Sequence, residues 1–379
     1  MIPFNHTLIL YGHSVSGIGD EKGLFNPFVM AFLSSAVFSA IGLYLVIKIC
    51  HHFKIYDQPN GRKIHHNPIP RLGGIVFMPA AVLGLYVALF ALGGLDNRME
   101  ISISTIVMAV GALMVYSIGI FDDRFGMKAS HKFVIQGISA LLLPLCGLII
   151  TDLNGLFGIH EISIWVGYPL TVLLIMTIVN AINLIDGIDG LASGLCLLIL
   201  TAYAYVFAIN NFIIIALMNI SIVGALIVFF CFNIFGKVGK MKIFMGDAGS
   251  LFLGYVCAYM SIKSMMQPIA PVNCGEEQTL ISVTLLLIPV IDVVRVTLQR
   301  WITGHGIFNP DKTHIHHLFM AAGVSMHGTL IAILLLFTFI CGVNYAMWNI
   351  RFHIPLILIL DIFIYCITLY TLHQMKMSK

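Results

Sequence analysis

Long apolar runs alternate with short polar segments along almost the whole chain. A helix that spans a membrane needs about 20 consecutive apolar residues, and this measure selects eleven segments. They lie near residues 28–50, 72–94, 101–121, 133–150, 162–183, 190–210, 212–232, 249–266, 279–300, 328–348 and 353–373. The pattern predicts an all-α polytopic membrane protein with about 11 transmembrane helices.

The composition agrees with this pattern. Hydrophobic residues make up 59% of the chain and charged residues 10%, and the mean hydropathy is +0.98. Soluble domains carry about 25% charged residues. No repeat or second soluble domain interrupts the apolar runs, so we expect one multi-span domain over residues 28–379, preceded by an extracytoplasmic arm, residues 1–27. The net charge is only +3 and no basic tail is present, so nothing indicates a nucleic-acid partner.

The distribution of charge predicts the orientation in the membrane. Lys and Arg favour cytoplasmic loops. With eleven spans and the N-terminus outside, the inner segments hold 14 Lys and Arg residues and the outer segments hold 3. We therefore expect an extracytoplasmic N-terminus and a cytoplasmic C-terminus. All five glutamates then fall outside, and the acidic residues of the inner face are all aspartates. Because the aspartate side chain is short and stiff, this indicates a site on that face that needs carboxylates in defined positions.

The stretch Asn180–Gly194, NAINLIDGIDGLASG, is the most unusual polar segment. Four polar residues recur there at intervals of three: Asn180, Asn183, Asp186 and Asp189. On a helix, residues three and four apart share a face, so we expect them to form a slowly rotating stripe. Carboxylates beside hydrocarbon are costly unless they are paired, solvated or bound to a metal. The plainer alternative is a helix end that frays into water.

Two further aspartate motifs fall on the inner face. Asp122 and Asp123 close the third span, and adjacent carboxylates repel each other unless a cation relieves them. This pair suits acid/base or metal chemistry, although it also suits a charged helix stop. In Met245–Ser250, MGDAGS, two glycines bracket Asp247 and allow a tight turn, although a plain helix cap is the alternative. Just upstream, Asn233, Phe244 and several lysines suit a nucleotide base and its phosphates.

Two inner loops add basic and imidazole groups. His314, His316 and His317 form an HIHH sequence that suits either zinc or phosphates, or else a surface cluster with no role. The loop Asp57–Gly74 is rich in proline and glycine and includes Lys63 among its cations. These cations suit an anionic lipid headgroup or a diphosphate, although the positive-inside bias alone also explains them.

Aspartates and asparagines with lysines on one face favour Mg²⁺ bound together with a diphosphate. Mg²⁺ prefers oxygen ligands and is usually held by one or two carboxylates plus substrate phosphates. A secondary transporter is the non-enzyme alternative, but its polar residues lie near the midplane in related repeats. Here they cluster at span ends and no repeat is found. An intramembrane protease is disfavoured because Phe244 replaces the first glycine of a GxGD motif.

Five motifs together resemble the polyprenyl-phosphate N-acetylhexosamine-1-phosphate transferases. They are DQPNGRKIHHNPIPRLGG, FDDR, NAINLIDGIDGLASG, KIFMGDAGS and FNPDKTHIHH, between Asp57 and His317. The chain looks like the bacterial branch that initiates O-antigen, enterobacterial common antigen or teichoic acid synthesis. The peptidoglycan branch typically has three consecutive histidines and a lysine where this chain has Gly126, so UDP-MurNAc-pentapeptide is a less favoured donor.

The resemblance implies a reaction and a location. UDP-N-acetylglucosamine and undecaprenyl phosphate would give undecaprenyl-diphospho-N-acetylglucosamine and UMP, with Mg²⁺, or Mn²⁺ as the alternative ion, in the bacterial inner membrane. The sequence leaves open whether the donor is another UDP-N-acetylhexosamine, which glycan is built, and whether the chain forms a homodimer. Direct attack by the lipid phosphate is favoured over a covalent intermediate, because a metal and positioning suffice in most phosphoryl transfers.

The resemblance also implies roles for individual residues. Asp247 is the expected principal metal ligand, with Asn183 close to the metal. Asp122 is the expected base for the lipid phosphate, supported by Asp123. The remaining expected contacts are with phosphates (Lys63 and Lys132), with uridine (Asp186, Asp189, Asn233 and Phe244, the last by stacking), and with the diphosphate or sugar (His314, His316 and His317).

Overall fold

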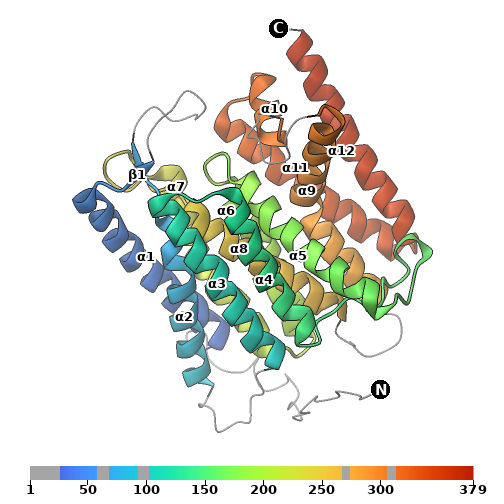
Figure 1. The fold of residues 1–379 in the computed structure, drawn as a ribbon, viewed down its shortest axis with the longest axis horizontal. Helices are drawn as coiled ribbons and strands as arrows, with labels where there is room; N and C mark the ends of the chain where they lie inside the picture. Colours follow the sequence, from blue (N-terminus) through green and yellow to red (C-terminus); the bar gives the residue numbers. More distant parts are fainter. Residues whose placement is uncertain (1–25, 58–67, 93–101, 267–273, 305–312, 379) are drawn as a thin grey trace.

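The computed structural model describes residues 26–57, 68–92, 102–266, 274–304 and 313–378. This part of the chain is almost entirely helical (Figure 1). Its α-helices are α1 (Pro27–Phe53), α2 (Phe77–Ala91), α3 (Ile103–Phe125), α4 (Ala129–Leu145), α5 (Ile164–Ile185), α6 (Leu191–Ile209), α7 (Ile213–Phe235), α8 (Gly246–Met266), α9 (Cys274–Ile302), α10 (Ile315–Ala321), α11 (Met326–Asn349) and α12 (Ile354–Met377). Short 3₁₀ turns, η3 (Gly73–Val76) and η5 (Leu156–Gly158), complete the helical elements.

Each of the eleven apolar segments expected from the sequence coincides with one long helix, so the chain is a polytopic membrane protein. Within the described residues, nine helical segments are long and apolar enough to cross a membrane. The other two are α4, which is apolar but has only 17 residues, and α8. The expected N-terminal arm lies outside the described residues apart from Asn26 and Pro27. Asn26 caps α1 by accepting a hydrogen bond from the Phe28 amide at 2.9 Å.

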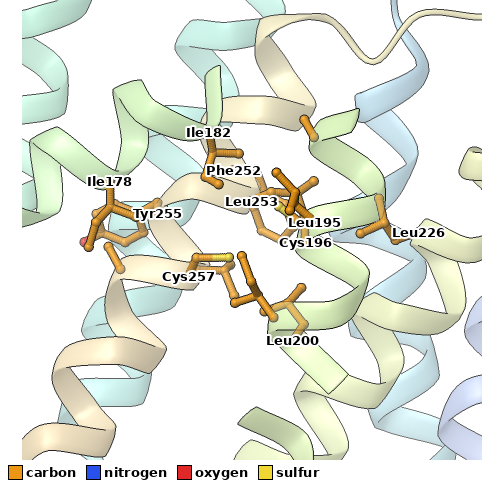
Figure 2. Close-up of a cluster of buried hydrophobic side chains, with 14 of the residues drawn as sticks. Ile178, Ile182, Leu195, Cys196, Leu200, Leu226, Phe252, Leu253, Tyr255 and Cys257 are labelled. Carbon is orange, nitrogen blue, oxygen red and sulfur yellow. The ribbon is translucent and has the colours of Figure 1, made fainter. Parts of the chain in front are cut away.

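Helix α8 forms the centre of the bundle. It packs against α3, α5, α6, α9 and η3, and nearly all of its residues are buried. This surrounding explains why α8 carries serines and a lysine that a lipid-facing helix would not tolerate. Figure 2 shows the buried cluster on its flank, where Phe252 and Leu253 of α8 lie near Ile182 of α5 and Leu195 of α6.

Helix α4 packs against α3 and α5, and the other helices form two groups beside this centre. On one side, α1 packs against α2 and α7. On the other side, α9, α11 and α12 pack together, and the short α10 contacts α11 and α12. The segment that contains α10 was expected as a loop, and it is a two-turn helix instead. β1, α10 and the C-terminal end of α12 all lie at the same end of the bundle (Figure 1).

A short backbone connection fixes the start of α8. The strands β1 (Tyr56–Asp57) and β2 (Ile69–Pro70) pair antiparallel, and the chain then continues alongside residues 244–245. Phe244 N donates to Pro70 O at 2.7 Å, Gly73 N donates to Phe244 O at 2.9 Å, and Gly74 N donates to Met245 O at 2.7 Å. A Cβ on Gly74 would collide with the backbone of Gly249, so glycine is required for this close approach.

Candidate active site

Three aspartates from two helices meet at the end of the bundle that carries β1 and α10. Asp122 and Asp123 come from the last turn of α3, and Asp247 comes from the first turn of α8. The ammonium of Lys132 joins two of them, because its Nζ lies 3.1 Å from Asp122 Oδ2 and 2.7 Å from Asp247 Oδ2. The structure therefore brings together the FDDR and MGDAGS motifs, which are more than 120 residues apart in the chain.

Arg71 is the second cation at this centre. Its Nε lies 3.0 Å from Asp123 Oδ1 and its Nη2 lies 3.2 Å from Asp247 Oδ1. A weaker contact of 3.8 Å joins its Nη1 to Asp57 Oδ1. The backbone connection described above holds Arg71 in this place, because Pro70 and Gly73 on either side bond to Phe244. In the sequence Arg71 is one of the cations of the loop Asp57–Gly74 that suit a lipid headgroup or a diphosphate. It was not assigned to the site itself, since the positive-inside bias alone also explains such an arginine.

The two adjacent aspartates of α3 have different surroundings. The Asp123 side chain is fully buried and accepts hydrogen bonds from the amides of Asp247 at 2.8 Å and Ala248 at 3.0 Å. It thus caps the N-terminus of α8, where a negative charge is favourable. Asp122 instead bonds to Lys132 and keeps 9% of its side chain exposed. Asp122 is the one of the pair available to a reactant, and Asp123 holds Asp247 in position.

Gly246 makes this capping arrangement possible. Its φ is +73°, which is costly for residues with a side chain. A Cβ there would collide with Arg71 O and with a carboxylate oxygen of Asp123. The glycine before Asp247 therefore has two functions, the turn into α8 and the space for its capping groups.

The stretch Asn180–Gly194 is a helix end, a turn and a helix start. Helix α5 ends at Ile185, Asp186 is its C-cap, and α6 begins at Leu191. The expected helical stripe of four polar residues was therefore wrong for Asp186 and Asp189, which lie in the turn. The backbone leaves the helical conformation at Asp186, whose ψ is +40°, and Gly190, with a φ of +79°, is the N-cap from which α6 begins.

Asn183, still on α5, faces α8. Its Nδ2 donates to Ser250 Oγ at 2.8 Å, one turn beyond Asp247. This bond uses the amide nitrogen, whereas a metal would take the amide oxygen, so the expected place beside a cation is compatible with it.

Asp186 is the residue of the turn whose carboxyl pKa is raised by burial and by the aspartates of the charged centre. Burial raises the pKa of its carboxyl well above the usual value, and the charges of Asp247, Asp189 and Asp123 raise it further. Arg71 opposes the shift. A carboxyl surrounded by other carboxylates in this way gains from any cation placed among them.

A second polar cluster holds the turn in place. Lys242 Nζ lies 2.6 Å from Asp189 Oδ2 and also donates to the backbone carbonyl of Asn233. The buried Asn233 side chain accepts from Gly190 N at 2.7 Å and donates to Ile243 O at 2.9 Å. Both ends of the Asn233 amide thus bond inside the protein and hold the turn in place, and its expected contact with uridine stays a prediction. Phe244 is half-buried beside this cluster.

The histidine segment lies against the same turn. The ring of the buried His316 occupies the space where a Cβ on Gly187 would stand. The ring centroids of His316 and His317 are 4.2 Å apart. Burial lowers the pKa of His316 to about 3, with smaller contributions from His317 and His314, so this imidazole is neutral at ordinary pH. Lys63 lies outside the described residues, and its expected place at the phosphates stays a prediction.

His314, at the N-terminus of α10, bonds through Nδ1 to Asp292 Oδ2 of α9 at 2.8 Å. Asp292 was noted in the sequence only as one of the inner-face aspartates. Its role was missed because an Asp near the end of an apolar run gives no sign of its distant partner. Arg295, one turn later, was missed for the same reason, and it bonds to Asp292 at 2.8 Å.

The donor set suits Mg²⁺ better than zinc. The carboxylate oxygens of Asp247 and the amide oxygen of Asn183 are hard ligands of the kind that Mg²⁺ prefers. Within the described ranges, no group of three His, Cys, Asp or Glu is arranged to hold a metal by itself. An ion held by one or two carboxylates together with substrate phosphates does not need such a group.

Comparisons with known proteins point to one group of enzymes. The model of a family described as glycosyl transferase family 4 matches residues 105–265. A probable undecaprenyl-phosphate N-acetylglucosaminyl 1-phosphate transferase of Bacillus subtilis (strain 168) is 31% identical over 83% of this chain and 83% of its own. The undecaprenyl-phosphate alpha-N-acetylglucosaminyl 1-phosphate transferase of Escherichia coli (strain K12) is 28% identical over 80% and 79%. That of Salmonella typhi is 27% identical over 82% of each.

Proposed function

The chain belongs to glycosyl transferase family 4, in the branch of undecaprenyl-phosphate N-acetylglucosaminyl 1-phosphate transferases, and from this premise we propose its donor, acceptor and site. It is a multi-pass membrane enzyme that joins a sugar phosphate to a polyprenyl phosphate. We assign UDP-N-acetylglucosamine as the donor and undecaprenyl phosphate as the acceptor. The products are undecaprenyl-diphospho-N-acetylglucosamine and UMP, the first step of a cell-surface polysaccharide.

One observation supports this assignment most strongly. Residues from α3, α4, α5 and α8 form one charged centre at a single end of the bundle, where Lys132 joins Asp122 to Asp247. Bringing two phosphorylated anions together is the main electrostatic problem of the reaction, and a centre of aspartates and fixed cations addresses it. The acceptor lipid stays in the bilayer, so a site at the rim of the helices is where it meets a water-soluble nucleotide.

The chain's own residues have separate tasks in this proposal. Lys132 and Arg71 bind phosphate oxygens and neutralise charge as the reactants approach. Asp122 accepts a proton from the lipid phosphate, whose oxygen then attacks the sugar-bearing phosphorus. The bond between that phosphorus and the bridging oxygen breaks, and UMP leaves with the oxygen. Asp186, Asp189 and Phe244 line the uridine side.

Asp247 and Asn183 would hold Mg²⁺, with Mn²⁺ as the alternative ion. The ion, when bound, neutralises the negative charge of the diphosphate. Asp123 positions Asp247 through its bonds to the backbone at the start of α8. His314, His316 and His317 close over the diphosphate or the sugar, and a neutral His316 offers either a donor or an acceptor there.

The site faces the cytoplasm in this account, with the N-terminus outside and the C-terminus inside the bacterial inner membrane. The excess of lysine and arginine at the same end as the aspartates supports that orientation. UDP-sugars would then reach the site directly from the cytosol.

A donor panel tests the proposal. The purified protein is incubated with undecaprenyl phosphate, Mg²⁺ and one of UDP-N-acetylglucosamine, UDP-N-acetylgalactosamine or UDP-MurNAc-pentapeptide, and UMP release is followed. We expect the highest kcat/KM with UDP-N-acetylglucosamine. A higher value with another donor would replace the assigned sugar, and release of UMP without the lipid would contradict the acceptor.

A further inference from the structure

Asp292, in the C-terminal half of α9, is a buried carboxylate with four separate donors. Its Oδ1 accepts from the Ile315 amide at 3.0 Å, from Arg295 Nη2 at 2.8 Å and from the Tyr365 hydroxyl at 2.9 Å. Its Oδ2 faces His314 Nδ1 at 2.8 Å. The carboxylate thus joins three helices, because Ile315 begins α10 and Tyr365 belongs to α12.

This carboxylate determines how the imidazole of His314 is presented. A carboxylate only accepts hydrogen bonds, so His314 must donate through Nδ1 and is left with Nε2 for other chemistry. That Nε2 is buried without a partner in the described structure, as are both ring nitrogens of His316. Buried polar atoms without partners are rare in folded proteins, and three of them on neighbouring imidazoles are suited to a ligand that would complete the hydrogen bonding.

Tyr365 is the most distant member of this network in the chain. Its side chain is 1% exposed, and its hydroxyl reaches Asp292 across the boundary between α12 and α9. One turn earlier on α12, the buried Asp361 accepts from Asn344 Nδ2 at 2.8 Å, and the same nitrogen donates to Thr284 of α9 at 2.8 Å. Helix α12 is therefore connected to α9 by two sets of hydrogen bonds, one through Asp361 and one through Tyr365. The set that includes Tyr365 lies next to the histidine segment.

We propose that Tyr365 is a positioning residue for the transfer reaction, because its hydroxyl holds the carboxylate of Asp292 that orients His314. The C-terminal helix then forms part of the reaction machinery, although it lies beyond residues 105–265 that the family model matches. This inference rests on the proposed function, in which His314 closes over the diphosphate or the sugar. Tyr365 itself touches no reactant.

The test compares two buried tyrosines that each join two helices, Tyr365 through the carboxylate of Asp292 and Tyr259 through the hydroxyl of Thr105. Tyr365→Phe removes one hydroxyl from the network. Tyr259→Phe is the matched control, because Tyr259 of α8 is also fully buried and its hydroxyl also joins two helices, through Thr105 of α3 at 3.0 Å. UMP release with UDP-N-acetylglucosamine gives kcat and KM for each variant, and thermal unfolding in detergent gives its stability.

We expect Tyr365→Phe to lower kcat about tenfold. The free energy of a hydrogen bond to a charged group corresponds to a change in rate of about 10- to 100-fold. Its KM for the donor should stay within about twofold, since the hydroxyl does not contact the donor. Tyr259→Phe should lower the unfolding temperature as well, because it also removes a buried bond between helices, but should leave kcat within about twofold. A Tyr365→Phe enzyme with wild-type kcat, or equal losses of kcat in both variants, would overturn the inference.

A double-mutant cycle separates positioning from general stabilisation. If Tyr365 acts through Asp292 on His314, adding Tyr365→Phe to His314→Gln should change the residual kcat by less than about twofold. The full tenfold loss in that background would show that Tyr365 acts independently of His314 and would contradict the inference. A wild-type protein that releases no UMP from any donor would overturn the proposed function and this inference together, whereas an active wild type matched by Tyr365→Phe overturns the inference alone.

Discussion

Lys132 Nζ lies 2.7 Å from Asp247 Oδ2, so a fixed cation neutralises the aspartate that we assign as the principal metal ligand. Arg71 occupies the other carboxylate oxygen of Asp247, at 3.2 Å. Any ion that binds Asp247 must therefore share it with these side chains or displace them. In the proposed reaction the same two cations would turn to the phosphates of the donor and the acceptor.

This sharing predicts an opposing effect of Lys132 on metal binding and on turnover. Lys132→Met removes a positive charge that competes with the ion for Asp247. The Mg²⁺ concentration that stabilises the variant should therefore be at least about threefold lower than the concentration that stabilises the wild type. Its kcat/KM should nevertheless fall about 100-fold, because a phosphate-binding cation is lost. Thermal unfolding during a Mg²⁺ titration, together with UMP release, measures both effects.

Lys128→Met is the control for that experiment, since Lys128 lies exposed at the start of α4 and carries the same charge. We expect it to change neither quantity by more than about twofold. Equal shifts in the two lysine variants would mean that overall charge, rather than the contact with Asp247, explains the effect.

Asp122 and Asp123 give a second prediction, because the structure separates two residues that are adjacent in the chain. Asp122→Asn should lower kcat about 1,000-fold and change the dissociation constant for UDP by less than about threefold, since it removes a base without disturbing the fold. Asp123→Asn should lower the unfolding temperature as well, because it weakens the cap of α8 and the bond to Arg71. Nucleotide binding by calorimetry and thermal unfolding distinguish these outcomes. An Asp122→Asn enzyme that loses nucleotide affinity in proportion to its rate would contradict a role as base.

The histidines provide a third prediction. His316→Ala should lower kcat/KM about tenfold or more, because its ring lies against Gly187 in the turn after α5. His51→Ala should change it by less than about twofold, since His51 bonds only to Tyr56 at the end of α1, at 2.9 Å, in the contacts that the structure describes. UMP release at saturating and limiting donor measures both variants. Similar losses of kcat/KM in the two variants would contradict the proposal that His316 belongs to the site and His51 does not.

The pKa of His316 predicts how stability depends on pH. Its value of about 3 in the folded protein lies below the ordinary value of 6.5, so protonation favours the unfolded state. The contribution of this group is complete above pH 6.5 and is lost as the pH falls toward 3. Between pH 7 and pH 5 the loss amounts to about 2 kcal/mol. His316→Gln, which does not titrate, should therefore lose less stability than the wild type over that range in thermal unfolding. An identical loss in both proteins would place the pH dependence elsewhere.

The helices could be predicted from the sequence because the length of an apolar run has a direct physical meaning in a bilayer. All eleven expected segments are helical, and the enzyme interpretation was confirmed over the transporter by the family match. Two features could not be derived in this way. Asp186 and Asp189 keep a helical spacing although α5 ends at Ile185 and α6 begins only after Gly190. The histidine segment forms α10, where Asp292 of α9 accepts the amide of Ile315.

The charged centre was predicted in part for a similar reason. A carboxylate near the end of a span is visible in the sequence, so Asp122, Asp123 and Asp247 could be named. Lys132 was also named, as a phosphate contact, but its bonds to Asp122 and Asp247 could not be read from the sequence. The place of Arg71 at the centre was not visible, because it depends on backbone bonds between Pro70, Gly73 and Phe244. Asp292 and Tyr365 depend on packing between α9 and α12 and leave no local pattern at all.

Asp247 anchors, in the proposed function, a magnesium-dependent transfer of a sugar phosphate to a membrane lipid. The most direct measurement follows UDP-N-acetylglucosamine labelled with ³²P in the phosphate next to the sugar, incubated with Mg²⁺, undecaprenyl phosphate and either wild-type protein or Asp247→Asn. We predict that the wild type moves the label into the lipid and releases unlabelled UMP, while Asp247→Asn, still inserted in the membrane, transfers less than about one thousandth as much. Label that stays with the nucleotide, or equal transfer by Asp247→Asn, would contradict the account.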